Sequence, residues 1–150
     1  MPAQTATVPV QTRPARATTI SQLLQQASSR IRTLHERELS AYGMTAKHFA
    51  ITTAILERGP MTQQALSRLL GIDRTTMVKL VDDLERLGVA FRDVHPTDRR
   101  AFEVDVTPEG DIVFHEASHA LATAEKSFFQ SISGEERRLL QQVLTRLVDS

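Results

Sequence analysis

Most of the chain after residue 18 carries apolar residues at the three- and four-residue spacing of amphipathic helices. The first such pattern predicts a helix over about residues 19–42. A second helix follows Thr45, a good N-cap residue, and stops at Gly59-Pro60. The apolar stripe of the first helix consists of Ile20, Leu23, Leu24, Ala27, Ile31 and Leu34.

Two further helices are predicted near the C-terminus. Thr107-Pro108 has the form of a helix start, with Thr as the cap and Pro at the first helical position, and it opens a helix over about residues 108–131. The run Ser-Gly-Glu-Glu from Ser133 is a capping box that opens a last helix over about 135–148.

The segment from Thr62 to Gly88 predicts two short helices with a tight turn at Gly71 between them. Asp73 caps the second of these helices and Gly88 closes it. Such an arrangement is typical of a helix-turn-helix. The apolar residues expected to face inward are Ala65, Leu66, Leu69 and Leu70 from the first helix and Met77, Leu80, Val81, Leu84 and Leu87 from the second.

The charges on the exposed side of the second helix are distributed along its length in the way that DNA recognition requires. Its N-terminal half offers Arg74, Thr75, Thr76 and Lys79, whereas its acidic residues gather in the C-terminal half. A recognition helix enters the major groove with its N-terminal residues, where Arg and Lys contact guanine edges or phosphates. A solvated face of mixed charge is the plainer alternative for any one of these residues.

The stretch at residues 89–110 predicts two strands joined by a turn that ends in Asp98, Arg99 and Arg100. After a helix-turn-helix, such a hairpin is typical of a wing, whose Arg can enter the minor groove. We expect Asp98 to brace that Arg through an ion pair. A surface ion pair without a partner molecule is the alternative.

Composition narrows the classes of function. The 150-residue chain is 41% apolar, so we expect one folded domain with an N-terminal tail over residues 1–18. It lacks cysteine, so we expect neither disulfides nor thiolate metal sites. We see no apolar run long enough to cross a membrane and no signal peptide, so we expect a cytoplasmic location. Its 18 basic and 18 acidic residues cancel, which weighs mildly against DNA binding. Between Thr62 and Thr107 there are seven basic and eight acidic residues, so binding must depend on where the charges lie.

From Ala65 to Gly110, the run ALSRLLGIDRTTMVKLVDDLERLGVAFRDVHPTDRRAFEVDVTPEG closely resembles the MarR family of bacterial transcriptional regulators. The resemblance covers residues 45–147 in outline and is specific in the winged part. It implies a mainly α (α+β) fold: a winged helix-turn-helix over about 45–107 with a two-stranded wing, flanked by N- and C-terminal dimerisation helices. The predicted DNA-contacting residues are Thr62, Gln63, Arg74, Thr75, Thr76, Lys79, Asp98, Arg99 and Arg100.

The resemblance also implies a homodimeric repressor on a near-palindromic operator, released by a small aromatic or phenolic acid. Arg92 matches a family Arg that can meet such an anion, and His35, His48 and His115 are candidates for the same site. For each His taken alone, an ordinary partly buried or exposed histidine is the alternative.

Three other classes of function compete with DNA binding. A metal-responsive regulator would need ligands such as His115 and His119, one helical turn apart, with His48 or His35; too few ligands cluster here, so we expect no metal and no cofactor. The sequence has no Cys nucleophile, no Gly-rich phosphate loop and no paired-carboxylate arrangement, so we expect no enzyme. A winged helix that binds only proteins need not keep exposed Arg and Lys on its recognition helix.

Overall fold

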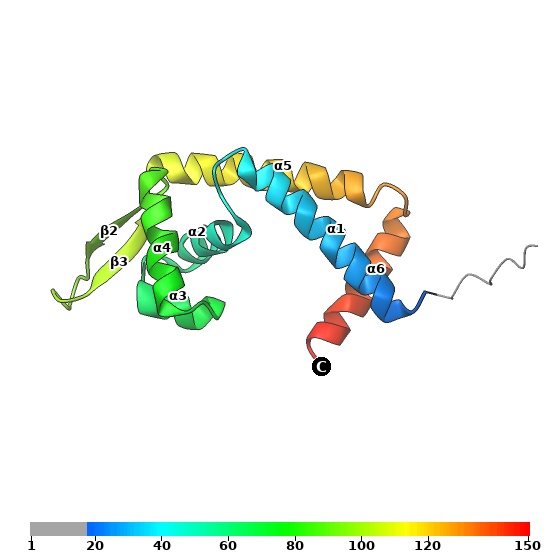
Figure 1. Ribbon diagram of the computed structural model, residues 1–150, viewed down its shortest axis with the longest axis horizontal. Coiled ribbons are helices and arrows are strands. Elements are labelled where there is room, and N and C mark those ends of the chain that lie inside the picture. Colours follow the sequence, from blue (N-terminus) through cyan, green and yellow to red (C-terminus); the bar gives the residue numbers. More distant parts are fainter. Residues whose placement is uncertain (1–17) are drawn as a thin grey trace, which may run out of the picture.

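The computed structural model describes residues 18–150, so nearly all of the tail expected over residues 1–18 lies outside the described residues. Figure 1 shows how the elements are arranged. In chain order they are α1 (Ile20–Ser40), α2 (Ala46–Arg58), β1 (Met61–Thr62), α3 (Gln63–Leu70), α4 (Arg74–Arg86), β2 (Ala90–Val94), β3 (Phe102–Val106), α5 (Pro108–Phe128) and α6 (Gly134–Val148).

Every helix in residues 18–150 begins after a residue whose side chain accepts a hydrogen bond from the backbone amide three positions further along the chain. The six N-caps are Thr19, Thr45, Thr62, Asp73, Thr107 and Ser133. Such caps satisfy amides that have no partner within the helix. The mainly helical winged fold predicted from the sequence is confirmed.

The sheet has three strands in the order β1-β3-β2, where the sequence predicted two. β2 and β3 form the hairpin of the wing, and β1 adds to the other edge of β3 through Met61 opposite Val104 and Thr62 opposite Glu103. Gly59 ends α2 at φ 87°, and the chain then runs extended beside β3 until Thr62 caps α3. Two residues are too few to show a strand period in the sequence.

The core lies between α2, α3, α4 and the sheet. Its fully buried side chains include Ile51, Leu66, Met77, Leu84 and Val104. Two residues predicted to face inward do not do so completely: Leu69 is 39% exposed and Leu87 is 42% exposed. Both lie near the C-terminal ends of their helices, at the margin of this small core.

The first turn of α5 is packed directly against the start of the wing. Thr107 donates its backbone N–H to Val89 O at 2.9 Å and its hydroxyl to Gly88 O at 2.6 Å. A Cβ added at Gly110 would lie 2.0 Å from Val89 O, so only glycine allows this approach.

The long helix α5 extends from the winged part to the side of the molecule where α1 and α6 lie (Figure 1). α6 has no buried residue, and Leu139 and Leu147 on it are 58% and 59% exposed. At the start of α1, Ile20 is 77% exposed. No helix within residues 18–150 has the length and apolar character needed to cross a bilayer.

Candidate nucleic-acid interface

The first turn of α4 is fixed by its own cap. Asp73 accepts the Thr76 amide at 2.9 Å and the Thr76 hydroxyl at 2.6 Å. The hydrogen bond from the Thr76 side chain, followed by that from its backbone, lowers the pKa of Asp73, because both favour the carboxylate. The single hydrogen of the Thr76 hydroxyl is therefore already donated to Asp73, whereas Arg74, Thr75 and Lys79 lie on the exposed face of the helix.

Three arginines from separate elements line one groove of about 360 Å³. Arg74 comes from the start of α4, Arg92 from β2, and Arg100 from the wing turn. The groove is also lined by Thr62, Gln63, Gln64, Ala101 and Phe102. The folded chain thus brings the start of the recognition helix and the tip of the wing to the same concave surface.

Two of these groove residues already have structural partners within the protein. Thr62 accepts the Ala65 amide at 3.1 Å as the cap of α3. Gln63 accepts a hydrogen bond from the Arg92 Nε at 2.8 Å. Their side chains are therefore held in place before any ligand arrives.

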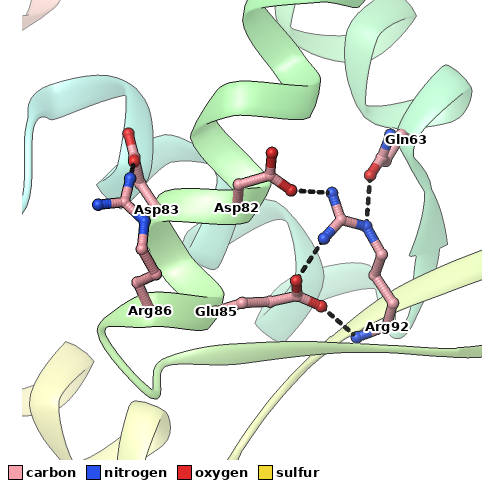
Figure 2. A network of polar contacts seen from close by, with 6 residues as sticks. All are labelled: Gln63, Asp82, Asp83, Glu85, Arg86 and Arg92. Atoms are coloured by element: carbon pink, nitrogen blue, oxygen red, sulfur yellow. Dashed lines mark hydrogen bonds and ion pairs between the residues drawn. The ribbon is translucent and has the colours of Figure 1, made fainter.

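Arg92 neutralises the acidic half of α4. Figure 2 shows its guanidinium between α4 and the start of α3, with hydrogen bonds to Asp82, Glu85 and Gln63. The bond to Asp82 Oδ1 is 2.7 Å long, and Glu85 also accepts the Arg92 backbone amide at 3.0 Å. The planar fork of a guanidinium, with its five N–H donors, suits such a set of acceptors.

The remaining acid of this helix, Asp83, is paired with Arg86 and lies near the ring of His48 (Figure 2 shows the Arg86 contact). His48 is buried in α2; its Nδ1 accepts the Thr45 amide at 3.0 Å, and its Nε2 lies 3.3 Å from Asp83 Oδ2. Burial, and then the positive charge of Arg86, lower the pKa of His48, so the neutral ring is favoured.

The cations on the first half of α4 and on the wing turn have no carboxylate partner among the residues that the structure describes. Within residues 18–150, Arg74, Lys79, Arg99 and Arg100 form no ion pair. All four are exposed, on the first half of α4 and on the wing turn. The zero net charge of the chain therefore hides a local separation of charge at this surface.

The expected ion pair between Asp98 and a wing arginine is not formed in the part of the chain that the structure describes, and that expectation was wrong. Asp98 Oδ1 instead accepts the backbone amide of Arg100 at 3.0 Å, and Asp98 O accepts the Ala101 amide at 3.0 Å. A short carboxylate often satisfies backbone amides two residues ahead in this way. Asp98 thus shapes the turn and leaves both arginine side chains available.

His95 in the same turn was not among the residues predicted from the sequence. Its Nδ1 lies 3.2 Å from the amides of both Thr97 and Asp98, and its Nε2 lies 3.3 Å from Glu103 Oε1. The spacing of two and three residues is that of an Asx turn, in which Asn or Asp supplies the acceptor. A histidine in that place is not a familiar turn signal.

Each of the four residues considered for an effector has an acidic neighbour of its own. His35 Nε2 lies 3.0 Å from Glu125, while His115 on the exposed side of α5 lies 3.4 Å from Asp111. His48 lies near Asp83, and Arg92 is bound by Asp82 and Glu85, as described above. Across residues 18–150 there is also no group of three or more His, Cys, Asp or Glu side chains that could hold a metal ion.

The sequence profile of the MarR family matches residues 42–101, which hold α2, α3, α4 and the first strand and turn of the wing. A protein described as a putative transcriptional regulatory protein for the hcr operon of Thauera aromatica is 31% identical over 105 residues, which are 70% of this chain and 63% of that relative. The chain belongs to the MarR family. It spans less than two thirds of the length of the Thauera relative.

Solved structures of this family share the fold. A probable transcriptional regulator from Pseudomonas aeruginosa is 28% identical, with a TM-score of 0.73 over 86% of this chain and 96% of the other. A mutant of MarR from Escherichia coli, solved in complex with operator DNA, has a TM-score of 0.72 at 19% identity, over 85% and 92% of the two chains. The second likeness, at so low an identity, concerns the fold alone.

Proposed function

We propose that this MarR-family chain binds double-stranded DNA and regulates transcription as a homodimer on a near-palindromic operator. The observation that carries the proposal is the position of four exposed cations, Arg74, Lys79, Arg99 and Arg100, which gather at the start of α4 and on the wing turn and form no ion pair within residues 18–150. The acids of α4 are at the same time paired with Arg86 and Arg92. Phosphate contacts supply much of the affinity of such proteins, and unpaired Arg and Lys need not first give up a carboxylate.

The proposed DNA contacts follow from where the exposed cations lie on α4 and on the wing turn. The N-terminal half of α4 enters the major groove, where Arg74, Thr75 and Lys79 face base edges and phosphates. The wing turn lies along the neighbouring minor groove with Arg100, and Arg99 meets the backbone. Thr62 and Gln63 border the same groove of the protein and would meet a phosphate there.

The homodimer is supported by the apolar surface that α1 and α6 leave uncovered. Besides Ile20, Leu139 and Leu147, the residue Val148 is 83% exposed. Isolated apolar residues are common on surfaces, but a whole helix without a buried residue is typical of an element completed by a partner. We expect Leu139→Glu to lower the molar mass measured by sedimentation equilibrium from that of a dimer to that of a monomer.

Repression, and release by a small aromatic or phenolic acid, are proposed from the family resemblance. An anion that binds Arg92 would have to compete with Asp82 and Glu85. The test is a DNA-binding titration with and without candidate phenolic acids; unchanged affinity with every acid tested would count against this release.

DNA binding is tested by selecting bound sequences from random duplexes with the purified protein, then measuring affinity for the recovered site. Arg100→Ala should weaken binding at least roughly tenfold, and Lys79→Ala should also weaken it. Each variant should reduce the slope of log affinity against log salt by about 2, since one cation is lost from each of two subunits. Lys126→Ala is the matched control, because Lys126 lies at the far end of α5.

Recovery of no preferred sequence and affinities equal to the control for both variants would refute the proposal. An unchanged affinity for Arg100→Ala alone would remove only the wing from the interface.

A further inference from the structure

The wing turn is built around a histidine ring. His95 N donates to Ala101 O at 3.0 Å, which closes the hairpin, and between these residues the chain must turn within five positions. Pro96 has no amide hydrogen, so the first donors inside the turn are the amides of Thr97 and Asp98. Both point at His95 Nδ1, and among residues 18–150 they have no other protein acceptor.

This geometry determines which nitrogen carries the proton. A backbone amide can only donate, so Nδ1 must be the unprotonated nitrogen that accepts. The proton then lies on Nε2, which is 3.3 Å from Glu103 Oε1 on β3. The Glu103 side chain is only 21% exposed, and its strand β3 is paired on both sides. The His95 ring thus lies beside Glu103 of β3 and offers the lone pair of Nδ1 to the turn.

The effect of the ring continues to the arginines. Asp98, whose amide is held by His95, accepts the Arg100 amide through Oδ1 and the Ala101 amide through its backbone oxygen. A linked set of hydrogen bonds therefore runs from His95 through Asp98 to the backbone of Arg100. A side chain as long as Arg can be directed only as well as its backbone is held.

We propose that His95 is a positioning residue for DNA binding: its unprotonated Nδ1 replaces the acceptor of an Asx turn and fixes the backbone from which Arg100 projects. This inference rests on the proposed function, because it assigns His95 to the same interface. His95 itself need not touch DNA.

The test compares His95→Ala, which removes the acceptor, with His95→Asn, whose Oδ1 can accept from amides two and three residues ahead. Two quantities are measured on the full chain: hydrogen exchange of the Thr97 and Asp98 amides by NMR, and affinity for the duplex recovered by selection. His95→Ala should speed exchange at both amides and weaken binding roughly fivefold, because a hydrogen bond typically accounts for a factor of about 2 to 12. His95→Asn should restore both quantities to within about twofold of the wild type.

A general loss of structure is excluded by the same pair of variants, since it would speed exchange in the core strands and would not be reversed by asparagine. Wild-type exchange rates and affinity in His95→Ala, or an asparagine variant as impaired as the alanine one, would overturn the proposal. If the wild-type protein binds no duplex, the proposed function fails, while the exchange rates still decide whether His95 holds the turn.

Discussion

Arg92 joins three elements of the winged part, so its removal is a stringent test of how this surface is held together. We consider Arg92→Met, which keeps most of the length of the side chain but removes every donor of the guanidinium. The variant leaves Glu85 and Asp82 without their cation and leaves Gln63 without its hydrogen bond.

The expected loss can be worked out from the exposure of the partners. A hydrogen bond to a charged group contributes about 1.5–3 kcal/mol when it is buried, and an exposed ion pair about 0–1 kcal/mol. The Arg92 side chain is 24% exposed and that of Glu85 is 34% exposed, so this pair lies between the two limits, whereas Asp82, at 51%, belongs near the lower one. Together with Gln63, we expect Arg92→Met to reduce the free energy of unfolding by about 2 kcal/mol.

The assay is urea denaturation followed by circular dichroism, at one fixed protein concentration because a dimer gains stability with concentration. A second variant, Arg92→Met with Asp82→Asn and Glu85→Gln, removes the two orphaned charges without changing side-chain shape. It should recover part of the lost stability, and it should bind DNA more tightly than Arg92→Met, because uncompensated carboxylates beside the interface repel phosphates.

Unchanged stability in Arg92→Met would mean that the network in Figure 2 contributes little in solution. A triple variant that binds DNA no better than Arg92→Met would show that neutralising the acids of α4 is not what Arg92 does for binding.

The remaining predictions concern single residues. The lowered pKa of His48 means that the unfolded chain takes up a proton more readily than the folded one, so stability should fall as pH drops below the usual histidine value of 6.5. The variant His48→Gln can keep the hydrogen bond to the Thr45 amide and should flatten the curve of unfolding free energy against pH; a curve identical to that of the wild type would contradict the role of this ring. Gly110→Ala should cost at least about 2 kcal/mol in urea denaturation because its Cβ meets Val89 O, and a neutral result would mean that α5 can shift freely. Asp98→Asn should bind DNA within about twofold of the wild type, since the amide oxygen can still accept from Arg100, whereas Asp98→Ala should bind more weakly; equal losses in the two would favour the ion pair after all.

Local signals in the sequence were sufficient for the helices. Thr45, Asp73 and Ser133 mark helix starts through side chains that reach only three residues ahead, so neighbours along the chain settle these boundaries. The same holds for Gly71, whose left-handed conformation (φ 63°) makes the turn between α3 and α4.

Features that depend on distant parts of the chain were not accessible. The strand at 61–62 exists because the edge of β3, some forty residues away, accepts it. Arg92 reaches Gln63 at a sequence separation of 29 and Asp82 at 10, so its role could not be read from its own surroundings. His95 was missed for a different reason: its neighbours are local, but an imidazole acting as the turn acceptor has no common sequence pattern.

The contact between α5 and the base of the wing has a mechanical consequence. Thr107 is bonded to both Gly88 and Val89, and Gly110 lies against Val89 with no room for a further atom, so this joint contains no hinge. A rotation of α5 therefore carries the hairpin along as one rigid body. In the proposed homodimer, the distance between the two hairpins is then governed by the tilt of the α5 helices, and a ligand that alters this tilt changes which duplex spacing fits.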